Sequence, residues 1–413
     1  MGSFGNGGSA AYPLNPTSAT RNPTPAVLAV LALMLASFQY FAGCALHEAS
    51  RPPVYYTGDP LTDDGAQVAA AAPKDRVLWQ DRLAAEALRR GEFDRAKRQL
   101  DAVIATLGGQ LSGPDEAARR ARSYFAGESE KTFIGEPYER VMAYYYRGLL
   151  YWRDGEPDNA RACFRSAALN DADMLAHQYT SDYVLLDYLE GLATVKLGGD
   201  GSDSFARARA NTKLPLPAYD ESANVLCFVE FGRGPMKYAA GEYGEQLHFD
   251  VRPSRAHSGA LLVDGRKVAL PPYDDLNFQA TTRGGRVMDY ILRNKAVFKG
   301  ATDAFGGLAL TGAIIAQENG EKQESAAAVM AVAGLISKAF SAATNPRADT
   351  RTWDNLPQYL SFAALRLPPG PHAARVEYYD ANGERLPEFS REVTIEVADG
   401  PHDTVVFLSQ LSR

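Results

Sequence analysis

The sequence predicts an α+β protein in which paired helices occupy the N-terminal part and strands dominate the C-terminal part. The chain has 413 residues, of which 46% are hydrophobic and 23% are charged, so it can bury a large core. Residues 77–107 place apolar side chains three and four positions apart, which indicates amphipathic helices. After Pro217 the pattern changes to short continuous or alternating apolar runs, which are typical of strands.

The charge and the cysteine content argue against several classes of protein. The net charge is −7, from 43 basic and 50 acidic residues, and the basic residues are dispersed, so no nucleic-acid partner is expected. Three cysteines without ligand spacing make neither a disulfide framework nor a zinc module, and Cys163 and Cys227 are expected to be core thiols. The common hydrolase, nucleotide-binding and redox motifs do not occur in the sequence, so no catalytic residue and no cofactor are predicted.

Residues 1–43 are predicted to be an export signal with a long leader. An almost wholly apolar run, residues 26–41, has the length of a signal-peptide core rather than that of a membrane span. The run leads into Ala42-Gly43-Cys44, which resembles the lipobox of a bacterial lipoprotein signal. This resemblance implies cleavage before Cys44 and acylation of its thiol. The alternatives are an ordinary signal peptide and a single-span anchor with a chance cysteine.

A tether and then a helical domain are predicted to follow the signal. Residues 44–73 contain several prolines and no hydrophobic periodicity, so they are predicted to be flexible. Residues 74–212 are predicted to form the helical domain. Its middle part carries small and aromatic residues at the spacing of a tetratricopeptide repeat, namely Tyr144, Gly148, Tyr151, Gly155, Ala160, Phe164 and Ala167. Weaker copies lie on both sides, so the domain resembles a short, irregular array of three tetratricopeptide-like units.

This resemblance also implies a binding face. In tetratricopeptide proteins the first helix of each unit builds a concave face that commonly binds extended peptides. Aromatic side chains flanked by Arg or Lys suit a peptide with acidic or C-terminal carboxylate groups. The candidate peptide-binding residues are Arg89, Tyr145, Trp152, Arg153, Tyr188 and Lys196. The alternative is that these aromatic residues contact the C-terminal domain or simply form core.

Residues 213–413 are predicted to form a β-rich domain. Residues 225–231 are a continuous apolar run that fits a buried strand, and Asp264-Gly265 marks a hairpin because both residues tolerate positive φ. Four more strands are predicted near the C-terminus, over residues 359–367, 373–379, 391–397 and 404–408.

The β-rich domain is predicted to carry a helical insertion over residues 285–344. Two apolar stretches inside it, residues 304–316 and 325–337, have 13 residues each, which is short of the ~20 that a spanning helix needs. A buried helical hairpin that covers the sheet is therefore preferred. A hairpin that touches the membrane and an oligomer contact are the alternatives.

The segment 348–357 reads Ala-Asp-Thr-Arg-Thr-Trp-Asp-Asn-Leu-Pro. Asp349, Arg351 and Trp353 are a candidate constellation, because an arginine can pair with a carboxylate or stack on an aromatic ring. A structural clamp between hairpin and sheet is preferred over a ligand site. Together with the lipobox and the repeat-like helices, this segment resembles an uncharacterised family of bacterial lipoproteins. That resemblance implies an envelope lipoprotein, and a link to peptidoglycan assembly through relatives encoded near activators of peptidoglycan synthases.

Gly-Pro-His occurs twice, ending at His372 and at His402, each time at the entry to a predicted strand. Two histidines at equivalent places could share a metal ion. No third ligand stands nearby in the sequence, so both are predicted to be polar caps on Gly-Pro turns, and no metal site is expected.

These features predict a lipid-anchored protein of the outer membrane that faces the periplasm. The sorting follows from the lipoprotein resemblance, because residue 45 is Ala and not Asp. The expected function is that of a non-catalytic adaptor, which binds an envelope protein through its tetratricopeptide-like repeats. The alternative is a structural or oligomeric envelope component whose apolar hairpin contacts the membrane.

Overall fold

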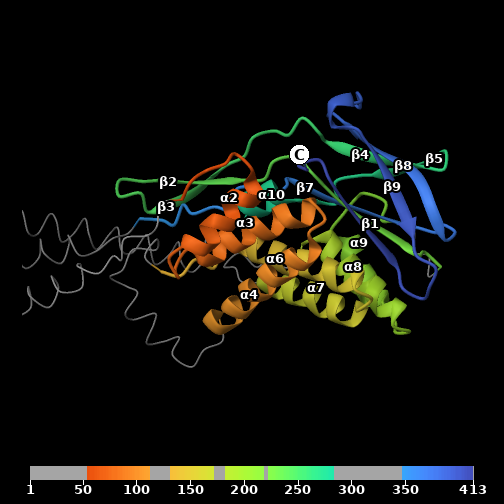
Figure 1. Ribbon diagram of the computed structural model, residues 1–413, viewed down its shortest axis with the longest axis horizontal. Coiled ribbons are helices and arrows are strands. Elements are labelled where there is room, and N and C mark those ends of the chain that lie inside the picture. The colour runs from red at the N-terminus through yellow and green to blue at the C-terminus, as the bar shows by residue number, and fades with distance from the viewer. Residues whose placement is uncertain (1–53, 112–130, 172–181, 218–221, 283–346, 413) are drawn as a thin grey trace, which may run out of the picture. The chain divides into compact units, whose positions relative to one another are not determined.

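A computed structural model describes residues 54–111, 131–171, 182–217, 222–282 and 347–412 of the chain (Figure 1). The signal, Cys44, and the predicted insertion at 285–344 with its apolar hairpin lie outside these residues. No described helix is both long enough and apolar enough to cross a membrane. The described part of the chain is an α+β protein, as the sequence predicts.

Most of the described helices follow one another as antiparallel pairs. Helix α6 begins with Pro137 at its first turn and with a capping box formed by Glu136 and Glu139. The helix ends at Arg153, and Gly155 follows with a φ of 82°, which lets the Glu156 N–H donate to the carbonyl of Tyr151. The helices are α2 (Pro60–Ala70), α3 (Arg76–Arg89), α4 (Phe93–Leu111), α6 (Pro137–Arg153), α7 (Pro157–Asp171), α8 (Val184–Lys196), α9 (Ser202–Ala210) and α10 (Leu276–Thr282), with a 3₁₀ turn at Pro387–Phe389.

Helix α2 corrects the C-terminal part of the flexible tether predicted over residues 44–73, because residues 60–70 are helical. Asp59 caps this helix by accepting a hydrogen bond from the Thr62 N–H, and Pro60 occupies its first position. Leu61 is buried, and Asp64 accepts a hydrogen bond from Arg82 of α3. The helix therefore has both a start signal and a tertiary partner, and the folded chain begins before residue 60.

The strands form two four-stranded sheets and a two-stranded ribbon. The first sheet has the order β10-β1-β7-β6, and its β1 runs parallel to β10 and antiparallel to β7. The second sheet has the order β5-β4-β8-β9 and is antiparallel throughout. The strands are β1 (Val225–Phe231), β2 (Met236–Ala240), β3 (Gln246–Asp250), β4 (Ser258–Val263), β5 (Arg266–Leu270), β6 (Asp274–Asp275), β7 (Tyr359–Leu365), β8 (Gly370–Tyr379), β9 (Arg391–Val397) and β10 (Thr404–Ser409).

The predicted strands are confirmed closely. The apolar run at 225–231 is β1, buried along its whole length, and the four C-terminal strands are β7 to β10. The predicted hairpin joins β4 and β5, where Asp264 and Gly265 both have positive φ.

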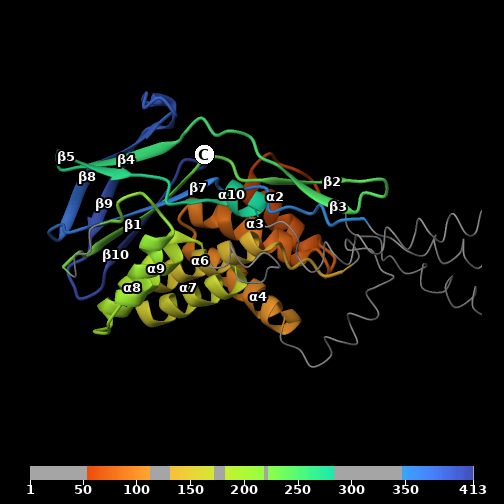
Figure 2. The same ribbon diagram turned by 180° about the vertical axis from the view of Figure 1, so that it is seen from behind.

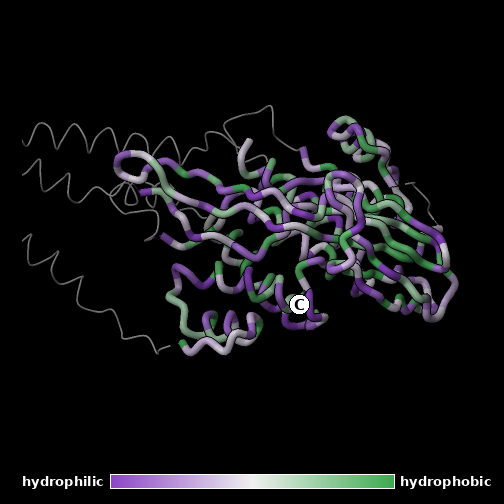
Figure 3. The backbone as a smooth tube through the Cα atoms, turned by 90° about the horizontal axis from the view of Figure 1, so that it is seen from above, coloured by the Kyte–Doolittle hydropathy of each residue, from purple (hydrophilic) through white to green (hydrophobic). Residues whose placement is uncertain are grey.

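The elements stack in three layers, with the first sheet in the middle (Figures 1 and 2). Along β1, Leu226 and Phe228 share a core with the helices, whereas Val225, Cys227 and Val229 share a second core with the other sheet. Figure 3 shows hydrophobic stretches of the backbone in green among hydrophilic stretches in purple. The described residues from 54 onward cluster as a single compact unit, and the core shared with the helices contains residues from both sides of the boundary predicted at residue 213.

Gly148 is a point of close approach inside the pair of helices α6 and α7. A Cβ atom at this position would lie 2.8 Å from the ring of Phe164, which is fully buried. We expect Gly148→Trp to lower the free energy of unfolding by about 1–3 kcal/mol, because the core has no room for the ring. Gly108→Trp is the matched control, since Gly108 in α4 has no neighbour within 4 Å. Thermal melts that place both variants at the same midpoint would contradict this packing.

Candidate functional site

The helix face predicted to bind peptide is covered by the first sheet. Tyr145, Trp152 and Tyr188 are each 1% exposed. The ring of Tyr145 meets Phe228 of β1 at 6.2 Å, and that of Tyr188 meets Phe362 of β7 at 5.7 Å. The prediction of an external peptide site on these aromatic residues is therefore wrong, because strands from the second half of the chain occupy the face.

The basic residues predicted on that face also have partners within the fold. Arg89 donates from Nε to Glu230 at 2.7 Å, and its side chain is 2% exposed. Lys196 pairs with Asp403 at 2.7 Å, at the entry to β10. The guanidinium of Arg153 lies over the ring of Phe93, 3.9 Å from its centroid. Arg89 and Lys196 thus tie the helices to the sheet.

A buried carboxylate, Glu230 of β1, is the centre of this junction. Besides Arg89, it accepts hydrogen bonds from the Tyr146 hydroxyl at 2.5 Å and from the Ser409 hydroxyl at 2.6 Å. Burial, followed by the charge of Glu230, raises the pKa of Tyr146 well above its ordinary value. One signal could have identified this centre, namely a single charged residue inside the continuous apolar run at 225–231.

The segment that contains the predicted constellation runs along strand β2. The Gly234 N–H donates to the carbonyl of Leu356 at 3.0 Å, and the Lys237 N–H donates to the hydroxyl of Thr352 at 3.2 Å. The same segment also reaches the helices, because Trp353 is fully buried and its N–H donates to Glu139 of α6 at 2.8 Å.

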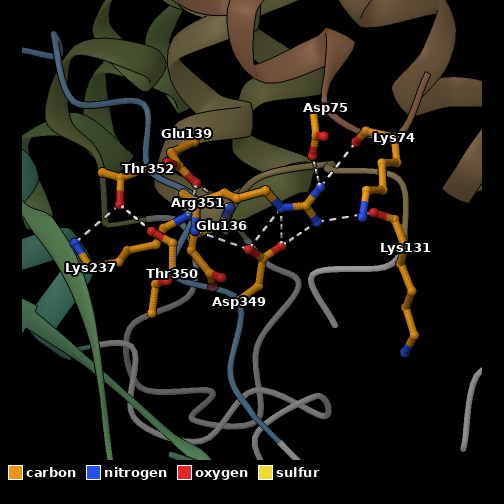
Figure 4. A network of polar contacts seen from close by, with 10 residues as sticks. All are labelled: Lys74, Asp75, Lys131, Glu136, Glu139, Lys237, Asp349, Thr350, Arg351 and Thr352. Atoms are coloured by element: carbon orange, nitrogen blue, oxygen red, sulfur yellow. Dashed lines mark hydrogen bonds and ion pairs between the residues drawn. The ribbon is translucent and has the colours of Figure 1, made fainter. Parts of the chain in front are cut away.

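Arg351 is the hub of a polar network at this place (Figure 4). Its Nε donates a hydrogen bond to the carboxylate of Asp349 at 2.9 Å. Its guanidinium also forms an ion pair at 2.7 Å with Asp75, the residue just before α3. It also donates to the carbonyls of Lys74 and Lys131, at 3.1 and 3.0 Å. Burial alone would raise the pKa of Asp349, but the hydrogen bonds and charge of Arg351 hold it below its ordinary value.

A second ion pair lies deeper, between Lys237 of β2 and Glu139. Both side chains are 1% exposed, and the Lys237 ammonium also donates to the carbonyl of Arg351 at 2.8 Å. Asp81 of α3 stands close by, and burial, followed by the Glu139 charge, raises its pKa well above the ordinary value. These contacts form a clamp that joins residues 348–356 to the helices and to β2. The clamp predicted between the hairpin and the sheet stays a prediction, because the hairpin lies outside the described residues.

The two histidines and the two described cysteines that the sequence singled out all contact other parts of the fold or lie in its core. His372 pairs with Asp264 at the turn between β4 and β5, whereas the ring of His402 lies against Gly155 at the turn between α6 and α7. Among the described residues, no three His, Cys, Asp or Glu side chains are placed to hold a metal ion. Burial raises the pKa of Cys163 to about 11 and that of Cys227 to about 12, which agrees with unreactive thiols.

An open groove of about 430 Å³ lies beside helices α8 and α9. The segment that follows α9 forms one wall of the groove. Two hydrogen bonds fix this segment: the Tyr188 hydroxyl donates to the carbonyl of Pro217 at 3.2 Å, and the Tyr273 hydroxyl donates to the carbonyl of Pro215 at 3.0 Å. The groove is lined by Tyr188, Phe205, Arg209, Thr212, Leu214, Pro215, Leu216 and Pro217. The lining combines apolar side chains with the hydroxyl of Thr212 and one cation, Arg209.

Comparison with protein-family models, with curated proteins and with solved structures finds no match to this chain. The described residues thus define an α+β protein of three layers, with a polar clamp on one side of the helices and an apolar groove beside the last helix pair.

Proposed function

We propose that this chain is a lipid-anchored protein of the bacterial outer membrane that faces the periplasm and acts as a non-catalytic adaptor through tetratricopeptide-like helices. The anchor is the acylated Cys44 of the lipobox. The partner is another envelope protein, and the groove beside α8 and α9 is where it binds. The groove is the observation that carries this proposal.

The tetratricopeptide-like character is supported by a contact that recurs in two helix pairs. In the first, a Cβ at Gly148 would meet the ring of Phe164 at 2.8 Å; in the second, a Cβ at Gly191 would meet the ring of Phe205 at 3.0 Å. In both, a glycine of the first helix faces a phenylalanine of the second. This is the close approach that small residues permit between paired helices.

The chemistry of the groove favours a peptide with an acidic group. Leu214 is 39% exposed, and it stands with two prolines beside the buried rings of Tyr188 and Phe205. Arg209 is exposed in the same lining, and it forms no ion pair with a described residue. An arginine that has no carboxylate partner among the described residues, and that lies beside apolar side chains, suits an extended peptide whose apolar side chains fill the groove and whose carboxylate pairs with the guanidinium.

The test is affinity capture from envelope extracts with the mature acylated protein, followed by a binding measurement with the protein that is captured. We expect Arg209→Glu to weaken that binding by about tenfold or more, because the ion pair becomes a repulsion. Arg266→Glu is the matched control, since Arg266 is an exposed arginine on β5. Cys44→Ala should release the protein from the membrane fraction.

Three results would contradict the proposal. Equal binding by the two arginine variants would show that the groove is not the contact surface. Catalytic turnover by the purified chain would contradict an adaptor. An unmodified mature N-terminus at another residue, found by mass spectrometry, would exclude the lipid anchor.

A further inference from the structure

Two neighbouring tyrosines at the beginning of the described chain are almost fully exposed. The side chain of Tyr55 is 81% exposed and that of Tyr56 is 70% exposed. Large aromatic side chains are usually more buried than these two. Neighbouring aromatic side chains that are exposed indicate a surface that contacts a membrane or another molecule. No role in the core or in the groove accounts for them.

The turn that follows the two tyrosines is held in place by the fold, and the hydroxyl of Tyr56 is bonded to α2. The carboxylate of Asp63 accepts hydrogen bonds from the Thr57 N–H at 2.7 Å and from the Gly58 N–H at 3.0 Å. The hydroxyl of Tyr56 accepts a hydrogen bond from Gln67 of α2 at 2.5 Å. Since α2 is itself bonded to α3, the rings project from a fixed turn rather than from a loose tail.

The position of this turn along the chain limits what the rings can reach. Tyr55 follows Cys44 by 55 − 44 = 11 residues. Even fully extended, this length spans no more than about 40 Å. A short tether of this kind gives an effective concentration in the millimolar range, so a weak affinity for the surface that holds the anchor is enough to keep the rings on it.

The charges beside the turn are balanced. Asp59 pairs with Arg90 at 2.6 Å, and Arg90 also pairs with Glu86 at 2.7 Å. Arg95 pairs with Glu92 at 3.3 Å. Among the described residues beside this turn, Arg90 and Arg95 are thus both paired with carboxylates, and the exposed tyrosines are the feature that stands out. Tyrosine is the side chain that collects at membrane–water interfaces, where its ring is apolar and its hydroxyl stays wet.

We infer that Tyr55 and Tyr56 lie in the headgroup region of the bilayer that holds the lipid anchor, and that they fix which side of the folded unit faces the membrane. This inference rests on the acylation of Cys44 in the proposed function. The acyl chains attach the protein to the membrane, and the two tyrosine rings determine its orientation there.

The test is hydroxyl-radical footprinting of the mature acylated protein in vesicles of phosphatidylethanolamine and phosphatidylglycerol. We expect the modification rates of Tyr55 and Tyr56 to be at least about twofold lower on vesicles than on the unacylated chain from Ala45 in buffer. Tyr238 is the internal control, because it is 48% exposed on β2 and its rate should not change. High salt should not restore the rates, since no net charge draws the surface to the lipid.

A pair of variants separates the rings from the anchor. In Tyr55→Ser/Tyr56→Ser, the amides of residues 57–59, 61 and 62 should exchange as fast on vesicles as in buffer, whereas in Tyr238→Ser they should stay as slow as in the wild type. Protein that washes off the vesicles would refute the lipid anchor itself. Three results with vesicle-bound protein would overturn the inference. The tyrosines could be unprotected, high salt could abolish their protection, or the protection could appear only after an envelope extract is added.

Discussion

Replacing Lys237 with methionine is expected to lower the free energy of unfolding by about 3–5 kcal/mol. Methionine keeps most of the buried stem, so the loss is that of the ammonium group. Without it, Glu139 stands in the core without its cation and next to Asp81, and the carbonyl of Arg351 loses a donor. Urea denaturation followed by circular dichroism measures the change.

The control for this variant is Arg252→Met. Arg252 pairs with Asp250 at 3.1 Å, but its side chain is 74% exposed, so we expect a change within about 0.5 kcal/mol. In the double variant Lys237→Met/Glu139→Gln, part of the lost stability should return, because residue 139 no longer carries a buried charge that lacks its cation. A single variant as stable as the wild type would mean that the clamp does not hold residues 348–356 to the helices.

The stability of the fold is expected to decrease as the pH rises from 4 to 7, because of Asp274. This carboxylate on β6 caps helix α8 by accepting hydrogen bonds from the Val184 and Leu185 N–H groups, at 2.7 and 3.0 Å. Burial, assisted by the nearby Asp182 and Asp171, raises its pKa from 3.8 to about 7.

The sign follows from proton linkage. Between pH 4 and 7 the folded chain holds a proton on Asp274 that the unfolded chain has released, so rising pH favours unfolding. The contribution is fully present below pH 4 and is lost as the pH rises through 7, and a shift of this size corresponds to roughly 4 kcal/mol.

Thermal melts between pH 5 and 8 test this expectation. In Asp274→Asn the part of this slope that comes from Asp274 should be lost, since the amide does not titrate, and the dependence on pH should become weaker than in the wild type. Asp380→Asn is the control, because hydrogen bonds in an exposed turn lower the pKa of Asp380, and its titration lies below the tested range. A variant at Asp274 whose melting temperature keeps the wild-type dependence on pH would show that this carboxylate is ionised throughout.

The strands were predictable because their signals are local. The run at 225–231 and the turn at Asp264-Gly265 each contain the information that specifies them. The same holds in retrospect for α2, whose Asp59-Pro60 start is a recognisable cap that the surrounding prolines obscured.

The covering of the helix face could not be predicted in this way. A row of aromatic and basic residues on paired helices has the same pattern whether it meets a peptide or a strand. What covers Tyr145 is Phe228, and what pairs with Arg89 is Glu230, 141 residues later. Similarly, Asp349 lies two residues from Arg351 in the sequence, but Asp75 lies 276 residues away, and only the fold brings it close.

The parallel pairing of β10 with β1 has a consequence for the order of events during biosynthesis. The bond between the Ser409 hydroxyl and Glu230 closes a loop of 179 residues, and Phe407 and Leu408 complete the two cores. A growing polypeptide that lacks residues 404–413 has no partner for one edge of β1, and Glu230 then lacks the hydrogen bond from Ser409. Closure of the middle sheet must therefore wait until β10 has been synthesised, and pairing over such a long sequence distance slows folding.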